Sequence, residues 1–363
     1  MKSDPPLARA QAFCAAYDLR LPILMAPMAG ACPPALAIAV AQAGGMGACG
    51  ALLMDQATIE GWASDVRSAT NGAFMLNTWI PDPAPARNPA HEADVRAFLA
   101  QWGPEVPADA ADAPGLDFDA QCQAMLAAGP HVISSIMGLY PPDFVAQMKA
   151  QGTRWFATVT TVAEARAAEA AGADAIIAQG AEAGGHRGAF RAEDAEAAMV
   201  GLFALLPAIA DAVDVPVIAA GGIGDARGVA AALMLGASAV VIGTALLRSP
   251  EAGTAPAWAG ALEGLAPEDT RPTRAFSGRL GRAVRSAYVE AAARADTPDP
   301  APYPIQRALT GPMRAEATRE GRADTMQAWA GQAAALARDA PAAEIVTTLW
   351  DDAQTLLAAR DVR

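Results

Sequence analysis

Residues 216–247 read PVIAAGGIGDARGVAAALMLGASAVVIGTALL, and this stretch decides the fold class. It predicts a strand over Val217–Ala220, a glycine turn, a helix over Arg227–Leu235 and a second strand over Ala239–Ile242. A strand, a helix and a second strand in this order form a parallel unit. Both strands are apolar throughout and do not alternate with polar residues, which is typical of a sheet covered on both faces.

The same alternation runs through about the first 250 residues. Further strands are expected at Ile23–Ala26, Met46–Cys49, Ala73–Leu76, Val132–Ser135, Trp155–Val159 and Ala175–Ala178. Helices are expected between them at Pro34–Ala43, Pro142–Ala150, Val162–Ala171 and Met199–Ala212. Eight strands in this order predict an α/β fold of the (β/α)8 TIM-barrel type, with an open doubly wound sheet as the alternative.

Two segments fall outside this alternation. Residues 81–114 are rich in Pro, Ala and Asp and predict a long inserted loop. From about Ala252 onward the strand pattern ends, and helical patterns remain at Met313–Arg322, Thr325–Arg338 and Ala342–Ala359. We therefore expect a barrel domain over residues 1–255 and a smaller helical C-terminal domain over residues 256–363 that covers the barrel mouth.

Composition narrows the class of protein further. The chain has 363 residues, 53% of them hydrophobic, and 39 acidic against 26 basic side chains give a net charge of -13. This content is too apolar for a disordered chain and too acidic for a general nucleic-acid binder. Prolines and glycines interrupt the uncharged stretch 21–54, and glycines interrupt 228–247, so no membrane span is expected. Four scattered cysteines and no apolar leader predict a cytoplasmic protein with free thiols.

Glycine-rich turns follow the last two strands of the predicted barrel. Gly221 and Gly222 follow one strand, and Gly243 and Thr244 follow the next. In phosphate-binding barrels these two loops hold the phosphate, because glycine lets backbone N–H groups approach its oxygens. The alternative is that the glycines serve turn geometry alone. A G-x-G-x-x-G match at residues 45–50 follows a helical pattern instead of a strand, so we reject it as a dinucleotide fingerprint.

His186 is the one histidine of three that falls in a glycine-rich loop at a strand's carboxyl end. Imidazole titrates near neutrality, so His186 is a candidate to take a proton from an acidic carbon or to donate a hydrogen bond to an anion. Glu182 lies four residues earlier, but Gly184 and Gly185 argue against a helix between them. No further ligand cluster is evident, and no metal is predicted.

A basic run lies in the C-terminal third of the chain. We expect intramolecular ion pairs or a solvated linker, with attraction of an anionic substrate as the alternative. The run comprises Arg271, Arg274, Arg279, Arg282 and Arg285.

Seven blocks of the chain together resemble the nitronate monooxygenase family, formerly called 2-nitropropane dioxygenase, and within it the first of two main classes. The most specific block reads ATVTTVAEARAAEAAGADAIIAQGAEAGGHRG. The others are PILMAPMAG, AGGMG, the block 216–247 quoted above, TRAFSGR, YPIQRALT and MQAWAGQ, so the resemblance runs from about Pro22 to Gln332.

The resemblance implies an FMN-binding barrel with a helical substrate domain. It places His186 as the catalytic, substrate-binding histidine and Tyr303 in the substrate pocket. The residues that it assigns to the cofactor are Pro27, Met28, Asn77, Gln179, Gly184, Gly185, Gly221, Gly222, Val241, Ile242, Gly243 and Thr244.

The chain departs from the family pattern at two places. Ser135 and Ile136 stand where members commonly carry a phenylalanine–histidine pair, which concerns the substrate pocket. Val241 and Ile242 stand where Gln-Met is frequent, which removes a side-chain contact to FMN but keeps the backbone site.

The activity implied is oxidative denitrification of alkyl nitronates, propionate 3-nitronate among the candidates, with FMN and O2 to a carbonyl compound and nitrite. The partners expected are small molecules, namely a nitronate and O2, and the protein is expected to be a monomer or homodimer. Two alternatives stay open. One is an FMN-dependent NAD(P)H oxidoreductase, such as a quinone or enoyl-thioester reductase. The other is a non-enzymatic protein that binds a phosphoryl ligand.

Overall fold

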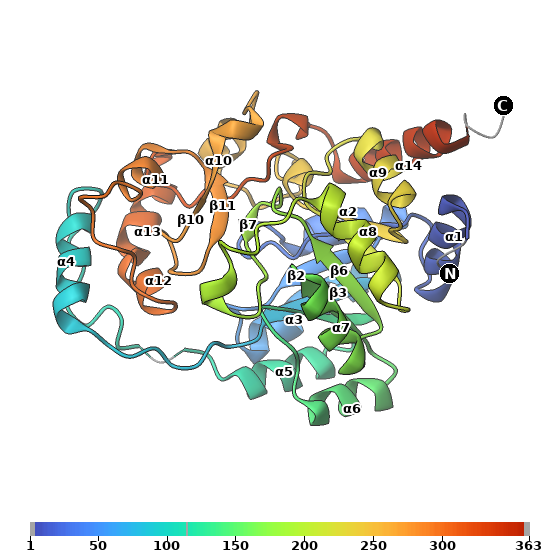
Figure 1. Cartoon of the computed structure of the whole chain (residues 1–363), viewed down its shortest axis with the longest axis horizontal. Coiled ribbons are helices and arrows are strands. Elements are labelled where there is room, and N and C mark those ends of the chain that lie inside the picture. Colours follow the sequence, from blue (N-terminus) through green and yellow to red (C-terminus); the bar gives the residue numbers. More distant parts are fainter. Residues whose placement is uncertain (1–3, 114, 359–363) are drawn as a thin grey trace.

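A barrel of eight parallel strands forms the centre of the computed structural model, which describes residues 4–113 and 115–358 (Figure 1). The barrel strands are β1 (Ile23–Met25), β2 (Gly47–Gly50), β3 (Phe74–Trp79), β4 (Val132–Ile136), β5 (Arg154–Val159), β6 (Ala175–Gln179), β8 (Val217–Ala220) and β9 (Ala239–Ile242). A second, three-stranded sheet is made of β7 (Gly185–His186), β10 (Thr270–Thr273) and β11 (Gly281–Val284).

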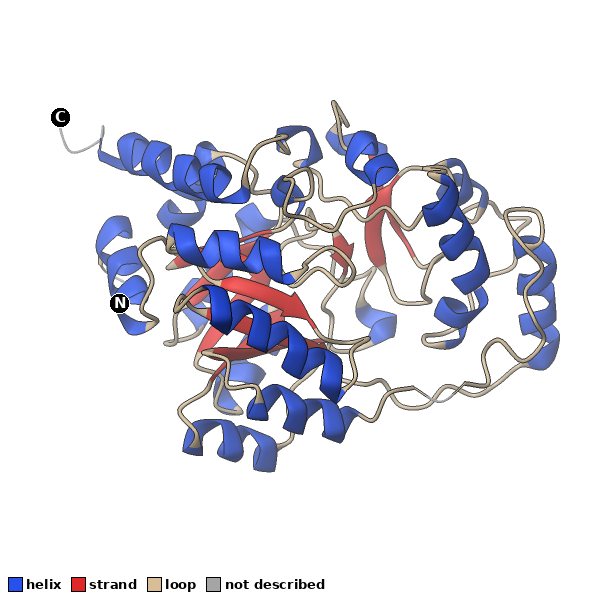
Figure 2. Cartoon of the chain, turned by 180° about the vertical axis from the view of Figure 1, so that it is seen from behind, coloured by secondary structure: helices blue, strands red, loops and turns tan. Residues whose placement is uncertain are grey.

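Helices surround the barrel and build a second unit beside it (Figure 2). Those within the first 250 residues are α1 (Pro6–Ala16), α2 (Pro34–Ala43), α3 (Gln56–Ala69), α4 (Pro89–Leu99), α5 (Phe118–Ala127), α6 (Pro142–Ala150), α7 (Val162–Ala170), α8 (Leu202–Ala212) and α9 (Ala226–Met234), with short 3-10 turns η1 (Ala192–Asp194) and η2 (Thr244–Leu246). The later ones are α10 (Pro256–Ala261), α11 (Ala287–Ala291), α12 (Ile305–Leu309), α13 (Gly311–Glu320) and α14 (Ala342–Ala358), with η3 (Pro267–Asp269) and η4 (Ala334–Leu336).

The sheet closes on itself, which confirms the predicted TIM barrel. Strands are ordered β1-β9-β8-β6-β5-β4-β3-β2, and a parallel bridge between Leu24 and Met46 joins the two ends. The residues of β1 are fully buried, as a strand between a filled barrel interior and a ring of helices must be. All eight predicted strands form within three residues of their expected bounds at each end, because each is a short apolar run between turn signals.

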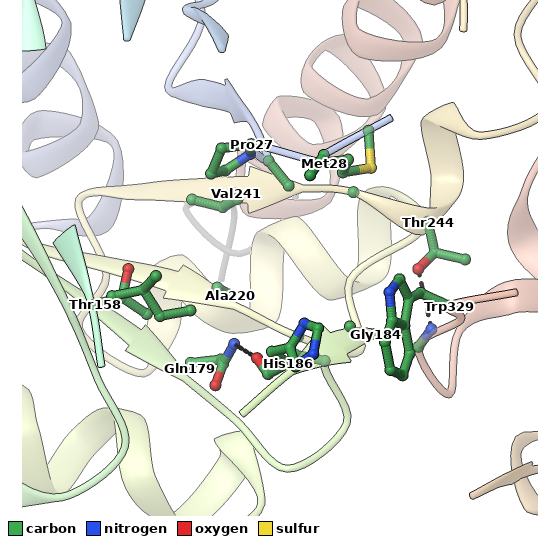
Figure 3. A pocket seen from close by; sticks show the side chains of 18 of the residues that line it. Pro27, Met28, Thr158, Gln179, Gly184, His186, Ala220, Val241, Thr244 and Trp329 are labelled. Carbon is green, nitrogen blue, oxygen red and sulfur yellow. Dashed lines mark hydrogen bonds between the residues drawn. The ribbon is translucent and has the colours of Figure 1, made fainter. Parts of the chain in front are cut away.

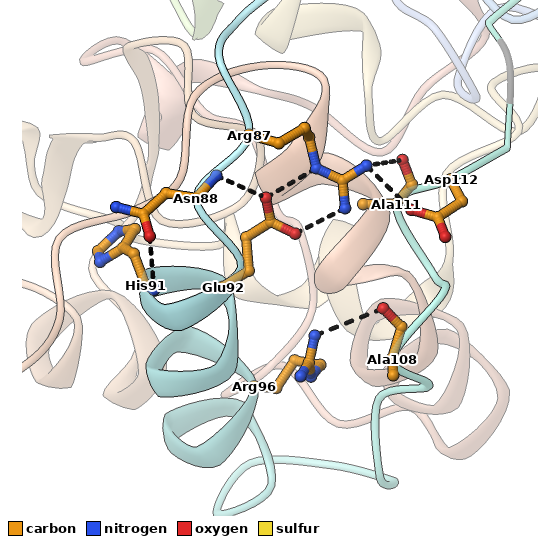
Figure 4. Close-up of polar contacts among 8 residues, drawn as sticks. All are labelled: Arg87, Asn88, His91, Glu92, Arg96, Ala108, Ala111 and Asp112. Carbon is orange, nitrogen blue, oxygen red and sulfur yellow. Dashed lines mark hydrogen bonds and ion pairs between the residues drawn. The ribbon is translucent and has the colours of Figure 1, made fainter.

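The segment 81–114, predicted as a loop, contains the helix α4. Asn88 caps this helix by accepting a hydrogen bond from the His91 N–H at 3.2 Å, and Pro89 occupies its first turn. Glu92 is nearly fully buried and forms a two-point ion pair with Arg87, with both N···O distances at 2.7 Å (Figure 4). The prediction of a loop was therefore wrong for Pro89–Leu99. The high content of Pro, Ala and Asp favoured a loop, and the helix-capping role of Asn88 was overlooked.

The second unit is not purely helical. Strands β10 and β11 pair antiparallel where the sequence showed no strand pattern, and the helix predicted over Thr325–Arg338 is irregular chain with the turn η4. The core of this unit joins α4 from the insertion to the C-terminal third: Val95 and Leu99 pack with Phe276, Tyr288 and other buried residues. In Figure 1 the insertion accordingly lies beside α12 and α13.

The long helix α14 packs on the barrel. It contacts α2 and α9, and its apolar face, which includes Ile345, Val346 and Leu349, belongs to the barrel core. The domain boundary near residue 255 stays a prediction, but α14 lies on the flank of the barrel and does not cover its mouth. The last residue of the helix predicted here, Ala359, lies outside the described residues.

Most of the basic run is used within the molecule, which confirms the prediction of intramolecular ion pairs. Arg271 and Arg285 approach Glu290, Arg274 binds Glu196, and Arg279 approaches Asp82. Arg282 instead donates to backbone oxygens, among them that of Ala181 at 3.0 Å. Of the described helices, none is both long enough and apolar enough to cross a bilayer.

A pair of glycine substitutions tests how α2 packs on β2. A Cβ on Gly47 would lie 2.7 Å from the Ala37 carbonyl oxygen of α2, whereas a Cβ on Gly61, which is exposed on α3, meets nothing within 4 Å. We expect Gly47→Ala to lower the free energy of unfolding by about 1–3 kcal/mol through overpacking. Gly61→Ala should raise it by about 0.5–1 kcal/mol through helix propensity. Urea denaturation of both variants measures this, and equal effects would contradict the close packing.

Candidate functional site

A cavity of about 260 Å³ opens at the carboxyl ends of the barrel strands. This is where active sites form in TIM barrels, because the loops that follow the strands converge there. In Figure 3, Pro27, Met28 and Val241 lie on one side of the space, and Gln179 and His186 lie on the other. The walls are mostly apolar, so the few polar groups are expected to fix the orientation of a ligand.

Glycine backbone forms one end of the cavity. Gly221 and Gly222 have φ of +109° and +69°, which L side chains rarely adopt, and both line the cavity together with Thr244. The helix α9 begins nearby, but its Gly228 N–H already donates to the carboxylate of Asp225 at 3.1 Å. Loop amides of the residues that line this end remain as candidate donors for an anion.

A C-terminal loop covers this end of the cavity. The Gly331 N–H donates to Thr244 Oγ1 at 3.0 Å, and the Gln332 N–H donates to the carbonyl oxygen of Glu182 at 2.9 Å. A Cβ on Gly184 would lie 2.4 Å from the Gly331 nitrogen, so only glycine fits between barrel and cover. The Glu182 carboxylate accepts from the Leu202 N–H at the start of α8, which is a structural use.

His186 lies in strand β7, which the sequence predicted as loop. β7 pairs antiparallel with β11, with His186 opposite Gly281. The His186 Nε2 atom lies 2.7 Å from Ser277 Oγ, in the turn that precedes β11. The side chain of Gln179 holds the backbone of residues 186–188. Its Nε2 donates to the His186 carbonyl oxygen at 3.0 Å, and its Oε1 accepts from the Gly188 N–H at 2.8 Å.

Two indole rings flank the imidazole. The ring centroid of Trp79 lies 4.5 Å from that of His186, and the centroid of Trp329 lies 4.7 Å away on tilted planes. Tyr303 contacts Trp79, with centroids 5.1 Å apart, and does not line the cavity. Large rigid rings leave the imidazole little freedom to turn.

The surroundings of His186 hold it uncharged. Burial lowers the pKa of His186 to about 3, and the positive charges of Arg279, Arg307 and Arg314 lower it in the same direction. Neutral imidazole has one nitrogen that accepts a proton and one that donates a hydrogen bond. A bound anion would raise this pKa again, because an opposite charge favours the imidazolium.

Most of the predicted cofactor residues do surround this cavity. Ile242 is the exception, because it is buried in the barrel core. Asn77 lines the wall while its Nδ2 donates to Ser134 Oγ at 2.9 Å, so its carbonyl oxygen remains for a ligand. The predicted residues that line the cavity are Pro27, Met28, Asn77, Gln179, Gly184, Gly185, His186, Gly221, Gly222, Val241, Gly243 and Thr244.

The residues at the two departures from the family pattern differ in whether they line the cavity. Ile136 lines the cavity and adds apolar surface to it, whereas Ser135 is fully buried and accepts a hydrogen bond from Trp155 Nε1 at 3.0 Å. Val241 lines the cavity near Pro27 and Met28.

Several lining residues carried no role in the sequence analysis, and Trp79, Trp329 and Arg307 matter most among them. Trp79 lies two positions after Asn77 on β3, so both side chains point to the same face of the strand. That spacing could have predicted that Trp79 lines the cavity. Trp329 and Arg307 lie in the blocks MQAWAGQ and YPIQRALT, but they reach the cavity only through the fold of the second unit.

The buried neutral imidazole predicts a pH dependence of stability. The folded pKa of His186 lies below its unfolded value of about 6.5, so the unfolded chain takes up a proton that the native state refuses. As pH falls from about 6.5 toward 3, this group lowers the free energy of unfolding. We expect His186→Gln to lose less thermal stability than wild type between pH 7.5 and 5.0. His131 contributes equally in both proteins, and identical losses would contradict the buried neutral form.

The hydrogen bond between Thr244 and Gly331 is expected to hold the C-terminal loop over the cavity. Thr244→Val removes the acceptor of the Gly331 N–H, and leaving a partly buried donor unpaired costs about 1–3 kcal/mol. The matched control is Thr318→Val, because Thr318 is exposed on α13 and only donates to the Arg314 carbonyl. Denaturation should show a loss for Thr244→Val and little change for the control. A loss no larger than that of the control would mean that this contact does not hold the cover.

Comparison with known proteins places the chain in one family. The sequence model described as nitronate monooxygenase matches residues 13–352. A nitronate monooxygenase of Paraburkholderia phytofirmans is 40% identical over 90% of this chain and 91% of its own length. The crystal structure of nitroalkane oxidase from Streptomyces ansochromogenes superposes with a TM-score of 0.87 at 36% identity, covering 95% of this chain and 99% of that one.

A more distant structure shares the scaffold. FabK from Thermotoga maritima is 26% identical, has a TM-score of 0.76 and covers 96% of this chain and 98% of its own. The match of the family model over nearly the whole chain, together with the relative at 40% identity, decides the assignment. The chain belongs to the nitronate monooxygenase family and is, like that family, a flavin-dependent oxidoreductase.

Proposed function

We propose that this protein oxidises alkyl nitronates with bound FMN and O2, releasing a carbonyl compound and nitrite. The observation that carries the proposal is a half-buried His186, held uncharged, that lines the same cavity as the glycine backbone of Gly221 and Gly222. The relatives named nitronate monooxygenase and nitroalkane oxidase support the same substrate class.

The residues of the cavity fit FMN in their chemistry. Loop backbone of residues 221–223 and 243–244 would hold the phosphate, since glycine permits close approach of amides. Pro27, Met28 and Val241 offer an apolar surface to one side of the ring system, and the Asn77 carbonyl oxygen is available to a ring N–H. When bound, FMN supplies the electron acceptor that no side chain can supply.

His186 positions the substrate and manages its proton. Ser277 and the indoles of Trp79 and Trp329 fix the ring, so its free nitrogen keeps one direction. With a preformed nitronate, the imidazole only orients the anion. With a neutral nitroalkane, it takes the α-proton, and the developing negative charge raises the basicity of the ring as the proton moves.

The apolar walls keep water from the reacting carbon. Ile136, Ala220 and Met28 line the space, and the loop that contains Trp329 and Gly331 covers it. Excluding water strengthens the attraction between the substrate anion and fixed polar groups.

Replacement of His186 tests the proposal. His186→Asn should keep FMN, read as flavin absorbance per protein, but lose turnover of neutral 2-nitropropane by roughly a hundredfold or more, because the general base is gone. Turnover of preformed propyl-2-nitronate should fall much less. Oxygen uptake and nitrite release measure both, and His91→Asn, in α4 away from the cavity, is the matched control.

Two results would contradict the proposal. Protein that is colourless and does not take up FMN would remove the cofactor. Rapid bleaching of the flavin by NADH or NADPH under anaerobic conditions, without nitronate turnover, would favour an NAD(P)H oxidoreductase.

A further inference from the structure

The cavity has a single permanently charged side chain among the described residues that line it. Arg307, on α12, lines the space together with His186 and Gln327, and no carboxylate side chain does. The protein lining of the cavity therefore carries a net positive charge, although the protein as a whole carries -13. A cavity of this kind binds an anion more tightly than a neutral molecule of the same shape.

Three arginines act on His186, but two are already engaged. Arg279 is paired with Asp82 at 3.1 Å. Arg314 donates to Thr310 Oγ1 at 3.1 Å, to Gln327 Oε1 at 3.1 Å and to the Arg307 carbonyl oxygen at 2.8 Å. Of these three, Arg307 alone has a guanidinium without a hydrogen bond or ion pair to any described residue, and it alone lines the cavity.

The main chain of Arg307 is held while its side chain is left free. Its carbonyl oxygen accepts from Arg314 and, at 3.2 Å, from Thr310 Oγ1, which anchors the end of α12. Arg314 is itself partly buried. The backbone of Arg307 is therefore held in place, while its guanidinium has no hydrogen-bond partner among the described residues. Such a side chain is free to bind a ligand.

We infer that Arg307 is the anion-binding and specificity-determining residue of this site, and that its guanidinium binds the two oxygens of the nitronate group in the cavity that His186 also lines. The inference rests on the proposed function for the identity of the substrate. A nitronate group is planar with two oxygens that share the negative charge, and a guanidinium matches such a pair with two parallel N–H donors.

This assignment divides the work at the site between two residues. Arg307 carries the charge that selects the anion, and His186 stays free to hold or take a proton. A neutral nitroalkane gains less from Arg307, since it offers no net charge. Arg307 therefore discriminates between the two protonation states of one substrate.

Binding of nitrate, a planar oxyanion that does not react, tests the inference without turnover. Isothermal titration of the FMN-loaded protein with sodium nitrate should show binding that Arg307→Met weakens at least tenfold. Arg307→Lys should fall between them, because an ammonium keeps the charge but not the two-point geometry. Arg319→Met, at an exposed position on α13, is the matched control and should bind like wild type.

Kinetics supply the second readout. In Arg307→Met the KM for propyl-2-nitronate should rise at least tenfold, whereas the KM for neutral 2-nitropropane should change less than threefold. Flavin content and melting temperature show that each variant is folded. Unchanged nitrate affinity and unchanged KM in Arg307→Met would overturn the inference, and so would wild-type protein that binds no nitrate.

The failure of this inference differs from the failure of the proposed function. If wild type binds nitrate through Arg307 but does not oxidise nitronates, the anion site stands and the proposed activity falls. If wild type oxidises nitronates and Arg307→Met behaves like wild type, the activity stands and the assignment of Arg307 falls.

Discussion

The pairing of β7 with β11 is the contact on which the site depends. It joins a two-residue strand that leaves the barrel after β6 to a strand almost a hundred residues later in the chain. His186 lies in this pair, and Ser277 in the turn before β11 reaches its ring. The catalytic candidate is thus held by backbone hydrogen bonds between the two units and does not hang from a free loop. Rigid placement of this kind is what proton transfer requires.

The positive charge around His186 also comes from the second unit, which the β7–β11 pair joins to the barrel. The segments that β11 brings to the barrel carry Arg279, Arg307 and Arg314, which all act on the imidazole. Arg279 is ion-paired with Asp82 and Arg314 donates to Gln327, and of the three guanidinium groups Arg307 is the one that lines the cavity. A strongly acidic protein thereby keeps a local positive field around one small cavity.

The barrel could be predicted from the sequence because its signals are local. Each strand is a short apolar run, and each turn after β8 and β9 shows its glycines, so the glycine end of the cavity was foreseen at Gly221, Gly222 and Gly243. The second unit could not be predicted in the same way. Strands β10 and β11 are four residues each, and β10 contains Pro272, so they exist only through pairing with each other and with β7. For the same reason Arg307 and Trp329 reach the cavity by long-range packing that no sequence period reveals.

The contact between Gly184 and Gly331 leaves no room for a side chain at the seam between barrel and cover. A larger residue at Gly184 or Gly331 would break this contact, so neither position can change while the contact is kept. Adaptation is then expected at other positions of the cavity, such as Leu53, whose side chain is half exposed. A change of substrate range in this protein is thus expected at such positions, while the seam stays fixed.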